Sequence, residues 1–389
     1  MKSNLEKFKP FFSTISMLFF LWIFLLSIKL LGGSFKNYFI NDAGSLIENA
    51  TGNPVVSLFI GILATAIVQS SSTTTSIIIA FVGSGTIPMT NAVPMIMGAN
   101  IGTSVTNTIV SFGNVRNKIE FQRSFSAAIV HDFFNWLSVL IFLPIEIFTN
   151  KVGENGENLG GFIARSARSI TEFIYGSGGV KFSSPLDSLV KPVAKWLQSS
   201  IGNLFDLSSK KGDYSTILLL IMVGFSMILL FVSLKYMSKI MKSLLLGKFE
   251  VYLHKFVFNN TATALIFGVL FTISVQSSSI TTSVIIPLCG AGILTLRQIF
   301  PYTIGANIGT TITGILASLV SGKIDGIIIA IVHTLFNIFG AAIFIPLKSI
   351  PIKLADSYAK LAANSRMWAI MFVLVLFFIL PILLIFTTG

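Results

Sequence analysis

Long apolar runs recur along this chain, and they restrict what it can fold into. A helix of about 20 residues crosses the apolar core of a bilayer, and because backbone groups in lipid must pair within the segment, such runs form α-helices. The pattern predicts an all-α polytopic membrane protein with about eight to ten crossings or half-crossings. Four runs reach spanning length: 11–31, 217–234, 324–346 and 367–386. Further apolar stretches, interrupted by Ser, Thr, Gly and Pro, cover 54–83, 93–112, 124–148, 256–273 and 283–321.

The charge distribution supports a membrane protein and argues against a nucleic-acid-binding one. Only 11% of the 389 residues are charged, whereas a soluble domain carries about 25%. The formal net charge is +12, but the cations lie beside apolar runs, as Lys and Arg do in short cytoplasmic loops. We therefore expect the N-terminus and the 113–123 loop in the cytoplasm. The flanking cations are Lys2, Lys7, Lys9, Arg116, Lys118, Arg123, Lys235, Lys239, Lys242 and Lys248.

Two segments of the chain are copies of one another. Residues 69–104 and 276–311, aligned without a gap at an offset of 207, are identical at 18 of 36 positions. Chance similarity between apolar segments does not preserve Gln, Asn and paired glycines, so the chain contains a duplicated unit. The repeated motifs are Gln-Ser-Ser-Ser (69–72 and 276–279), Gly-Ala-Asn-Ile-Gly-Thr (98–103 and 305–310) and His-x-x-Phe-Asn (131–135 and 333–337).

The duplication divides the chain into two membrane halves, residues 1–148 and 214–389, joined by residues 149–213. The connecting segment is rich in glycine and mixed charge, and it has no run long and apolar enough to span. Its apolar residues between Leu186 and Leu204 follow helical spacing. This spacing fits a helix in the membrane interface or, equally, a linker helix that packs on the protein.

Each half contains a segment that we expect to enter the membrane and return. The Gln-Ser-Ser-Ser motifs lie in apolar segments followed by glycine pairs, Gly83 with Gly85 and Gly290 with Gly292. Segments of this length are too short to cross twice, so we predict re-entrant helical hairpins. Two homologous halves of this kind enclose a site near the bilayer midplane, where irregular backbone is tolerated only in a protein interior or along a cavity.

The polar runs of the two copies indicate a ligand site. Isolated Ser and Thr residues commonly link transmembrane helices, but eight hydrogen-bonding side chains in succession from Gln69 to Ser76 are costly unless something satisfies them. The runs contain no Cys, His or carboxylate, and Cys289 is the only cysteine in the chain, which argues against a transition metal. Hydroxyl groups and helix N–H groups suit an oxyanion, and hydroxyl and carbonyl oxygens equally suit sodium.

The runs also contain no Arg or Lys, so a dehydrated anion would depend on helix dipoles and on a co-bound cation. A sodium ion about 4 Å away stabilises the anion by about 4 kcal/mol at an effective dielectric constant of about 20, and this coupling is reciprocal. Asn100 and Asn307 lie between glycines, where we predict unwound backbone. The candidate ligands for phosphate or sodium are Gln69, Ser70, Ser71, Ser72, Thr73, Thr74, Asn100, Thr103, Gln276, Ser277, Ser278, Ser279, Asn307 and Thr310.

Asp132 is an acidic residue inside the apolar stretch 124–148. An acid at the centre of a membrane helix costs about 2.5–3.5 kcal/mol. A pair with Arg123 is one explanation, whereas His131 is a poor partner because adjacent helical residues point apart. The second copy has Thr334 at this position, so an additional sodium site in one half is the other explanation. The His and Asn residues of the third motif are expected to make polar helix-packing contacts rather than bind ligands.

The motifs resemble those of the type II sodium-phosphate cotransporter family. The aligned region covers most of 54–148 and 256–346. The strings that carry the similarity are Gln-Ser-Ser-Ser-Thr from residue 69, Met-Gly-Ala-Asn-Ile-Gly-Thr-Ser-Val-Thr-Asn-Thr-Ile-Val from 97, Val-His-Asp-Phe-Phe-Asn-Trp-Leu-Ser-Val-Leu from 130, Gln-Ser-Ser-Ser from 276 and Gly-Ala-Asn-Ile-Gly-Thr-Thr from 305.

This resemblance implies two inverted repeats whose Gln-Ser-Ser-Ser segments form the sodium and phosphate pathway. Electrogenic members carry Asp directly after the His of the third motif and electroneutral members carry Gly, so Asp132 implies electrogenic transport with one additional sodium ion. The chain departs from the family where Thr73 of the first copy is matched by Ile280, which makes the copies unequal. Its short central loop lacks the cysteines and glycosylation of animal members, which suggests a bacterial protein of the cell inner membrane.

The predicted function is sodium-coupled uptake of inorganic phosphate by alternating access. Its partners are phosphate, sodium and the lipid bilayer; no cofactor is expected, and a homodimer is compatible with the family. A carrier for another small anion, such as sulfate or a carboxylate, and an ion channel are the alternatives. A membrane enzyme with a serine nucleophile would need a base within reach, and the polar runs contain no His or Asp.

Overall fold

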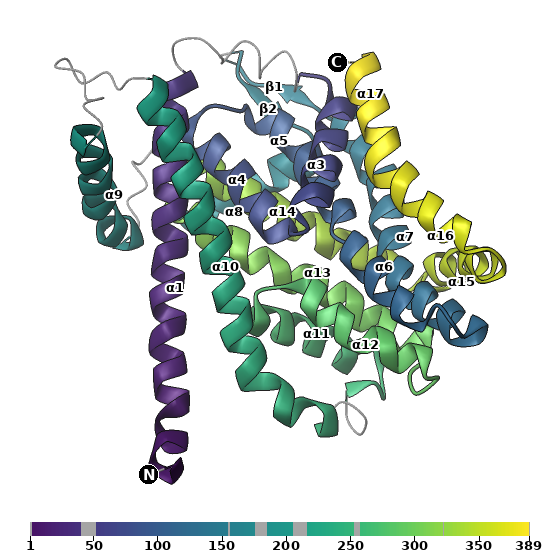
Figure 1. Ribbon diagram of the computed structural model, residues 1–389. Helices are drawn as coiled ribbons and strands as arrows, with labels where there is room; N and C mark the ends of the chain where they lie inside the picture. The colour runs from purple at the N-terminus through teal and green to yellow at the C-terminus, as the bar shows by residue number, and fades with distance from the viewer. Residues whose placement is uncertain are drawn as a thin grey trace.

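The computed structural model describes residues 2–39, 52–154, 156–175, 185–204, 216–252, 257–321 and 323–388. The described part is almost entirely helical (Figure 1). The first half contains α1 (Lys2–Phe39), α3 (Pro54–Val68), α4 (Ser71–Ser84), α5 (Met89–Gly102), α6 (Val105–Ser111), the short 3₁₀ turn η1 (Phe112–Asn114) and α7 (Lys118–Phe148). The second half contains α10 (Thr216–Tyr252), α11 (Thr261–Val275), α12 (Ser278–Gly290), α13 (Leu296–Ser318), α14 (Ile324–Phe344), α15 (Ser349–Asn364), α16 (Arg366–Leu374), the π-helical turn η3 (Val375–Ile379) and α17 (Leu380–Thr388).

The membrane-protein prediction is confirmed by the length and hydropathy of the helices. Five segments in the described part of the chain are long and apolar enough to span a bilayer, and four of them coincide with the apolar runs read from the sequence. Three further apolar helices, α3, α11 and α12, are too short to span, as expected for half-crossings. The five segments are Phe12–Ser34, Lys118–Phe148, Ile217–Met237, Ile324–Phe344 and Arg366–Thr387.

Residues 149–213 contain more regular structure than a linker. A two-stranded antiparallel hairpin, β1 (Lys151–Val152) and β2 (Asn158–Gly160), leads into α8 (Phe162–Tyr175), and α9 (Pro185–Leu204) covers the residues with predicted helical spacing. Glu146, near the end of α7, accepts hydrogen bonds from the N–H groups of Gly161 and Ile163, both at 2.8 Å. This carboxylate caps the start of α8. The placement of α9 in the membrane interface stays a prediction.

Close helix packing within each copy depends on glycine. Gly98 lies against the carbonyl oxygen of Leu58, and Gly305 lies against that of Leu265, so a Cβ at either position would overlap the neighbouring helix. Each glycine belongs to a Gly-x-x-x-Gly sequence, with Gly102 and Gly309, which lets helix backbones approach closely in membranes. As a result α5 packs along α3, and α13 packs along α11.

The prediction of unwound backbone at the Gly-Ala-Asn motifs is therefore wrong. Asn100 lies in the last turn of α5, and Asn307 lies in the middle of the continuous helix α13. The flanking glycines serve helix contact rather than helix unwinding. In the first copy a break does occur, but it lies at the end of the motif, at Thr103 and Ser104 between α5 and α6.

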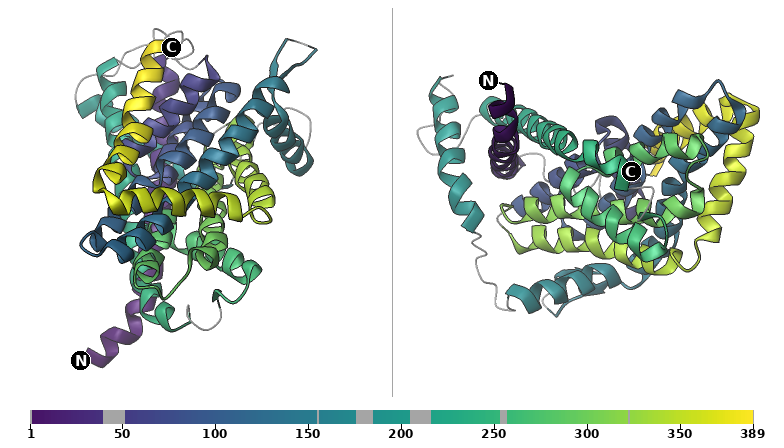
Figure 2. Two further views of the ribbon diagram at one scale, coloured as in Figure 1. Left: turned by 90° about the vertical axis from the view of Figure 1, so that its right-hand side faces the viewer. Right: turned by 90° about the horizontal axis from the view of Figure 1, so that it is seen from below.

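The helix that follows each Gln-Ser-Ser-Ser break packs against the opposite half. Helix α4 packs against α13 and α14 of the second half, and α12 packs against α6 and α7 of the first half. Figure 1 shows α3 to α5 in the upper part of the molecule and α11 to α13 in the lower part. Helices α1 and α10 pack along each other at one side, and α15 to α17 lie at the other, in both Figure 1 and the view from below in Figure 2. The inverted relation of the repeats stays a prediction.

Candidate functional site

Each Gln-Ser-Ser-Ser motif interrupts the helical chain with the same backbone geometry. Gln69 ends α3 and Gln276 ends α11, both with φ 59° and ψ 24°. They are the only non-glycine residues with positive φ in the described part of the chain. A left-handed residue of this kind costs about 1–2 kcal/mol unless it is glycine, and such strain gathers at functional sites. The same backbone conformation in both copies indicates that the two motifs have the same structural role.

The residue after each glutamine begins a new helix. Ser70 caps α4 by accepting a hydrogen bond from the N–H of Thr73 at 3.2 Å, and Ser277 caps α12 in the same way through Ile280 at 3.3 Å. The first turn of a helix carries N–H groups without intrahelical partners and a positive partial charge. Two such helix starts, rich in hydroxyl groups, suit an oxyanion, while the carbonyl ends of α3 and α11 suit a cation.

Both motifs line one cavity of about 410 Å³. Five of the predicted ligands contribute to its wall, which joins residues about 200 positions apart in the sequence. Ile280 lies there too, where the first copy has Thr73, so the wall is more polar on the first side. The predicted ligands in this wall are Ser70, Ser72, Thr73, Gln276 and Ser277.

The side chains of the two glutamines brace the helix breaks. The Oε1 atom of Gln69 accepts a hydrogen bond from Thr106 at 2.8 Å, and that of Gln276 accepts one from Thr313 at 2.9 Å. Thr106 and Thr313 are equivalent at the repeat offset of 207. Gln276 is buried, whereas Gln69 is exposed. The bonds hold the first break against α6 and the second against α13, a role that the sequence pattern did not reveal.

Asn100 and Asn307 lie in a buried polar network between the halves rather than in the cavity wall. Asn307 donates to the side chain of Asn135 at 2.8 Å and pairs with the ring of His131. Asn100 pairs with the ring of His333 at 3.2 Å. The third motif of each half therefore contacts the second motif of the other half, which agrees with the expected polar packing role of the His and Asn residues.

The other predicted ligands are placed nearby without lining the cavity. The hydroxyls of Thr103 and Thr310 donate to carbonyls of their own helices, Ala99 and Ala306, at 3.1 and 3.0 Å. Thr74 likewise donates to the carbonyl of Ser70 at 3.1 Å. Ser71 and Ser278 are buried in the first turns of α4 and α12, and Ser279 is half-buried.

Asp132 is fully buried and has no charged partner in the described part of the chain. One carboxylate oxygen accepts a hydrogen bond from Ser104, at the break between α5 and α6, and the other has no hydrogen-bond partner among the described residues. The alternative pair with Arg123 does not form: Arg123 lies at a different cavity. A buried carboxylate beside a helix break, with one oxygen that has no hydrogen-bond partner among the described residues, suits a cation.

Two lysines of α10 complete the cavity that the Gln-Ser-Ser-Ser motifs share. Lys235 and Lys239 line it together with Phe231 and Leu234. From the sequence these cations were assigned only to the membrane boundary, because nothing local links α10 to the polar runs. Spacing of four residues does place both side chains on one helix face.

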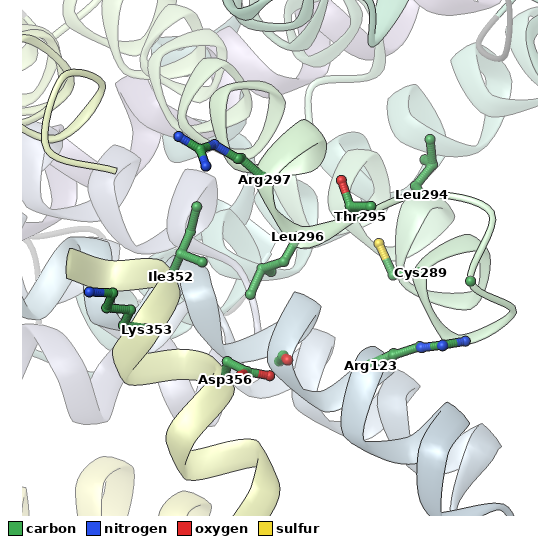
Figure 3. A pocket seen from close by; sticks show the side chains of 11 residues that line it. Arg123, Cys289, Leu294, Thr295, Leu296, Arg297, Ile352, Lys353 and Asp356 are labelled. Carbon is green, nitrogen blue, oxygen red and sulfur yellow. The ribbon is translucent and has the colours of Figure 1, made fainter. Parts of the chain in front are cut away.

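A second cavity, of about 440 Å³, lies between the start of α7, the α12–α13 loop and α15. Its wall includes three cations, Arg123, Arg297 and Lys353, and one acid, Asp356. Figure 3 shows Arg297 and Lys353 extending to one side and Arg123 to the other. The cations do not converge on one point, and Asp356 is paired with Lys360 at 2.7 Å, so this cavity is a weaker candidate for a small anion.

An all-helical membrane protein in which two broken helices present their N-termini to one cavity belongs to the class of membrane transporters built from duplicated halves. Within that class the chain belongs to the Na⁺/Pi-cotransporter family, whose model matches residues 23–162 and 229–355. The match includes every residue of the shared cavity. Since the family consists of transporters, the membrane-enzyme alternative is set aside.

Characterised relatives are similar over nearly the whole chain. The sodium-dependent phosphate transport protein 2A of Rattus norvegicus is 34% identical over 419 residues, which cover 94% of this chain and 66% of the rat protein. The 2B protein of Homo sapiens is 31% identical over 445 residues, which cover 95% of this chain and 64% of the human protein. The chain thus spans about two thirds of the length of these relatives. No solved structure shows a significant match.

Proposed function

We propose that this protein uses the sodium gradient to carry inorganic phosphate into the cell. The observation that carries the proposal is the cavity where the helix starts at Ser70 and Ser277 meet, in a chain of the Na⁺/Pi-cotransporter family. The hydroxyl and N–H groups would bind phosphate, and sodium would bind at neighbouring carbonyl and hydroxyl oxygens. The relatives named above are sodium-dependent phosphate transport proteins, which supports this choice of substrate.

The proposed mechanism is alternating access. Phosphate and sodium would bind together, because the motifs provide no permanent cation of their own and the anion depends on co-bound sodium for charge compensation. The cavity lies between two halves that contact each other through α4 and α12, so movement of one half against the other would change its access. We place the protein in the cell inner membrane with a cytoplasmic N-terminus, on the distribution of basic residues.

Asp132 is proposed to bind an additional sodium ion and so make transport electrogenic. Its burial, its lack of a charged partner among the described residues and its unpaired oxygen support this role. One additional sodium ion moving with each phosphate would add one positive charge to the net charge carried in each transport cycle. This proposal is separate from the assignment of the substrate.

The experiment is radiolabelled phosphate uptake and phosphate-evoked current in proteoliposomes, comparing wild type with Asp132→Gly and Asp132→Asn. We expect sodium-dependent uptake with inward positive current in wild type, and uptake without current in both variants. Current that survives both substitutions would remove the role of Asp132 and leave phosphate transport intact. If wild type shows no sodium-dependent phosphate uptake, the proposed substrate is wrong, and sulfate or a carboxylate becomes the next candidate.

A further inference from the structure

The two lysines that line the shared cavity have no counterpart in the repeated motifs. Lys235 and Lys239 lie on α10, outside both copies, and both side chains are exposed at the wall that also contains Ser70 and Ser277. No Asp or Glu is among the described residues that line this cavity. Two cations next to two positively polarised helix starts create a region of positive potential that only an anion can offset.

Aromatic packing positions the part of α10 that carries these lysines. Tyr236 stacks on Phe20 of α1 with ring centroids 5.0 Å apart and planes at 8°. The Nζ atom of Lys239 lies 5.9 Å from the centroid of the Tyr236 ring, in cation–π range. The α1–α10 contact therefore holds the cationic face of α10 beside the cavity.

We infer that Lys235 and Lys239 form a sodium-independent binding site for inorganic phosphate at the mouth of this cavity. The inference rests on the proposed function for its choice of phosphate. Because both side chains are exposed and lie on a helix with few contacts to α4 and α11, they would attract the anion without enclosing it. The site between the serine motifs would keep its dependence on sodium, and the lysines would raise the phosphate concentration beside it.

The two lysines lie in the C-terminal half of α10, outside its first turns. Helices α1 and α10 run in opposite directions, and the C-terminal part of α10 points toward the same end as the start of α1 (Figure 1). Lys235 stands at the end of the spanning segment Ile217–Met237, and Lys239 stands just beyond it. With the N-terminus in the cytoplasm, as proposed above, these lysines would hold phosphate on the cytoplasmic side of the cavity.

The test measures binding of radiolabelled inorganic phosphate to the purified full-length protein by equilibrium dialysis in sodium-free choline buffer of low ionic strength. The double variant Lys235→Gln with Lys239→Gln is compared with wild type. The matched control is Lys191→Gln with Lys195→Gln, an exposed pair at the same spacing on α9, away from the cavity. Lys235→Arg with Lys239→Arg keeps the charge and tests rescue.

We expect wild type, the α9 control and the arginine variant to bind phosphate, and the Lys235/Lys239 glutamine variant to bind about threefold to tenfold more weakly, as for exposed charge pairs. Added choline chloride should remove the difference by screening. Equal affinity in all variants, or no binding without sodium, would overturn the inference. If the inference fails in this way while wild type still shows sodium-dependent phosphate uptake, the proposed function stands. If binding depends on the lysines but wild type shows no uptake, the proposed function is wrong and the inference stands.

Discussion

At the residue scale, Gln69 and Gln276 show how one motif supports two different environments. Both adopt the same left-handed backbone, and each accepts a hydrogen bond from a threonine 37 residues later, Thr106 or Thr313. Gln276 and Thr313 are buried, whereas Gln69 is exposed. Water can replace the lost donor only for the exposed glutamine, so equivalent bonds in the two copies contribute unequally to stability.

The substitution Thr313→Val should therefore lower the free energy of unfolding by about 1–3 kcal/mol, because it leaves a buried carbonyl oxygen without a donor. Thr106→Val, the matched change in the other copy, should cost less than about 1 kcal/mol. Unfolding of the purified protein in one detergent, followed with both variants beside wild type, measures the difference. An equal decrease in the free energy of unfolding for both variants, or a larger decrease for Thr106→Val, would show that burial does not determine how much these hydrogen bonds stabilise the protein.

At the element scale, the glycines of the repeated motifs determine helix packing. Gly305 faces the carbonyl of Leu265 across the α11–α13 contact, with no space for a side chain. The sequence alone could not decide this role, because glycine serves unwound backbone and close helix contact equally well. The distinction depends on which helix lies opposite, and that is a property of the tertiary structure rather than of the motif.

The substitution Gly305→Ala should push α13 away from α11 and destabilise the protein by about 1–3 kcal/mol, the usual cost of overpacking. Gly224→Ala is the control, since Gly224 lies within α10 and nothing stands within 4 Å of an added Cβ; alanine there should be neutral or slightly stabilising. Thermal unfolding and the yield of monodisperse protein report the effect. A loss at Gly224 as large as that at Gly305 would contradict the packing role.

The features that could be predicted from the sequence depend on local patterns of residues, whereas those that could not depend on contacts between segments far apart in the chain. The spanning helices are set by local hydropathy, and all four of the long apolar runs correspond to spanning segments. The polar runs that contain Ser70, Ser72 and Ser277 are likewise a local signal, and these serines do line one cavity. The contribution of Lys235 was missed because it depends on α10 lying beside helix starts far away in the sequence.

At the scale of the whole molecule, the proposed function requires both halves to contribute to one cavity. The packing of α4 and α12 against the opposite halves brings the two motifs together, and the buried network of Asn100, Asn307 and the third-motif residues joins the halves. The wall of this cavity takes residues from both halves. The central claim is that phosphate and sodium bind together in the cavity between these motifs.

Labelling of a single cysteine tests this claim most directly. Cys289 is the only native cysteine, so Cys289→Ser gives a background into which Ile280→Cys can be introduced; Ile280 lines the cavity without offering a polar ligand. A second cysteine variant at Ser199, on the exposed surface of α9, serves as the control. The rate of reaction with a charged methanethiosulfonate reagent is measured with sodium alone, phosphate alone and both together.

The account predicts that sodium and phosphate together slow labelling at position 280 severalfold, that either alone has a smaller effect, and that labelling at position 199 does not change. An Ile280→Cys variant that retains sodium-dependent phosphate uptake, yet reacts at the same rate with and without both ligands, would contradict the placement of the transport site in this cavity.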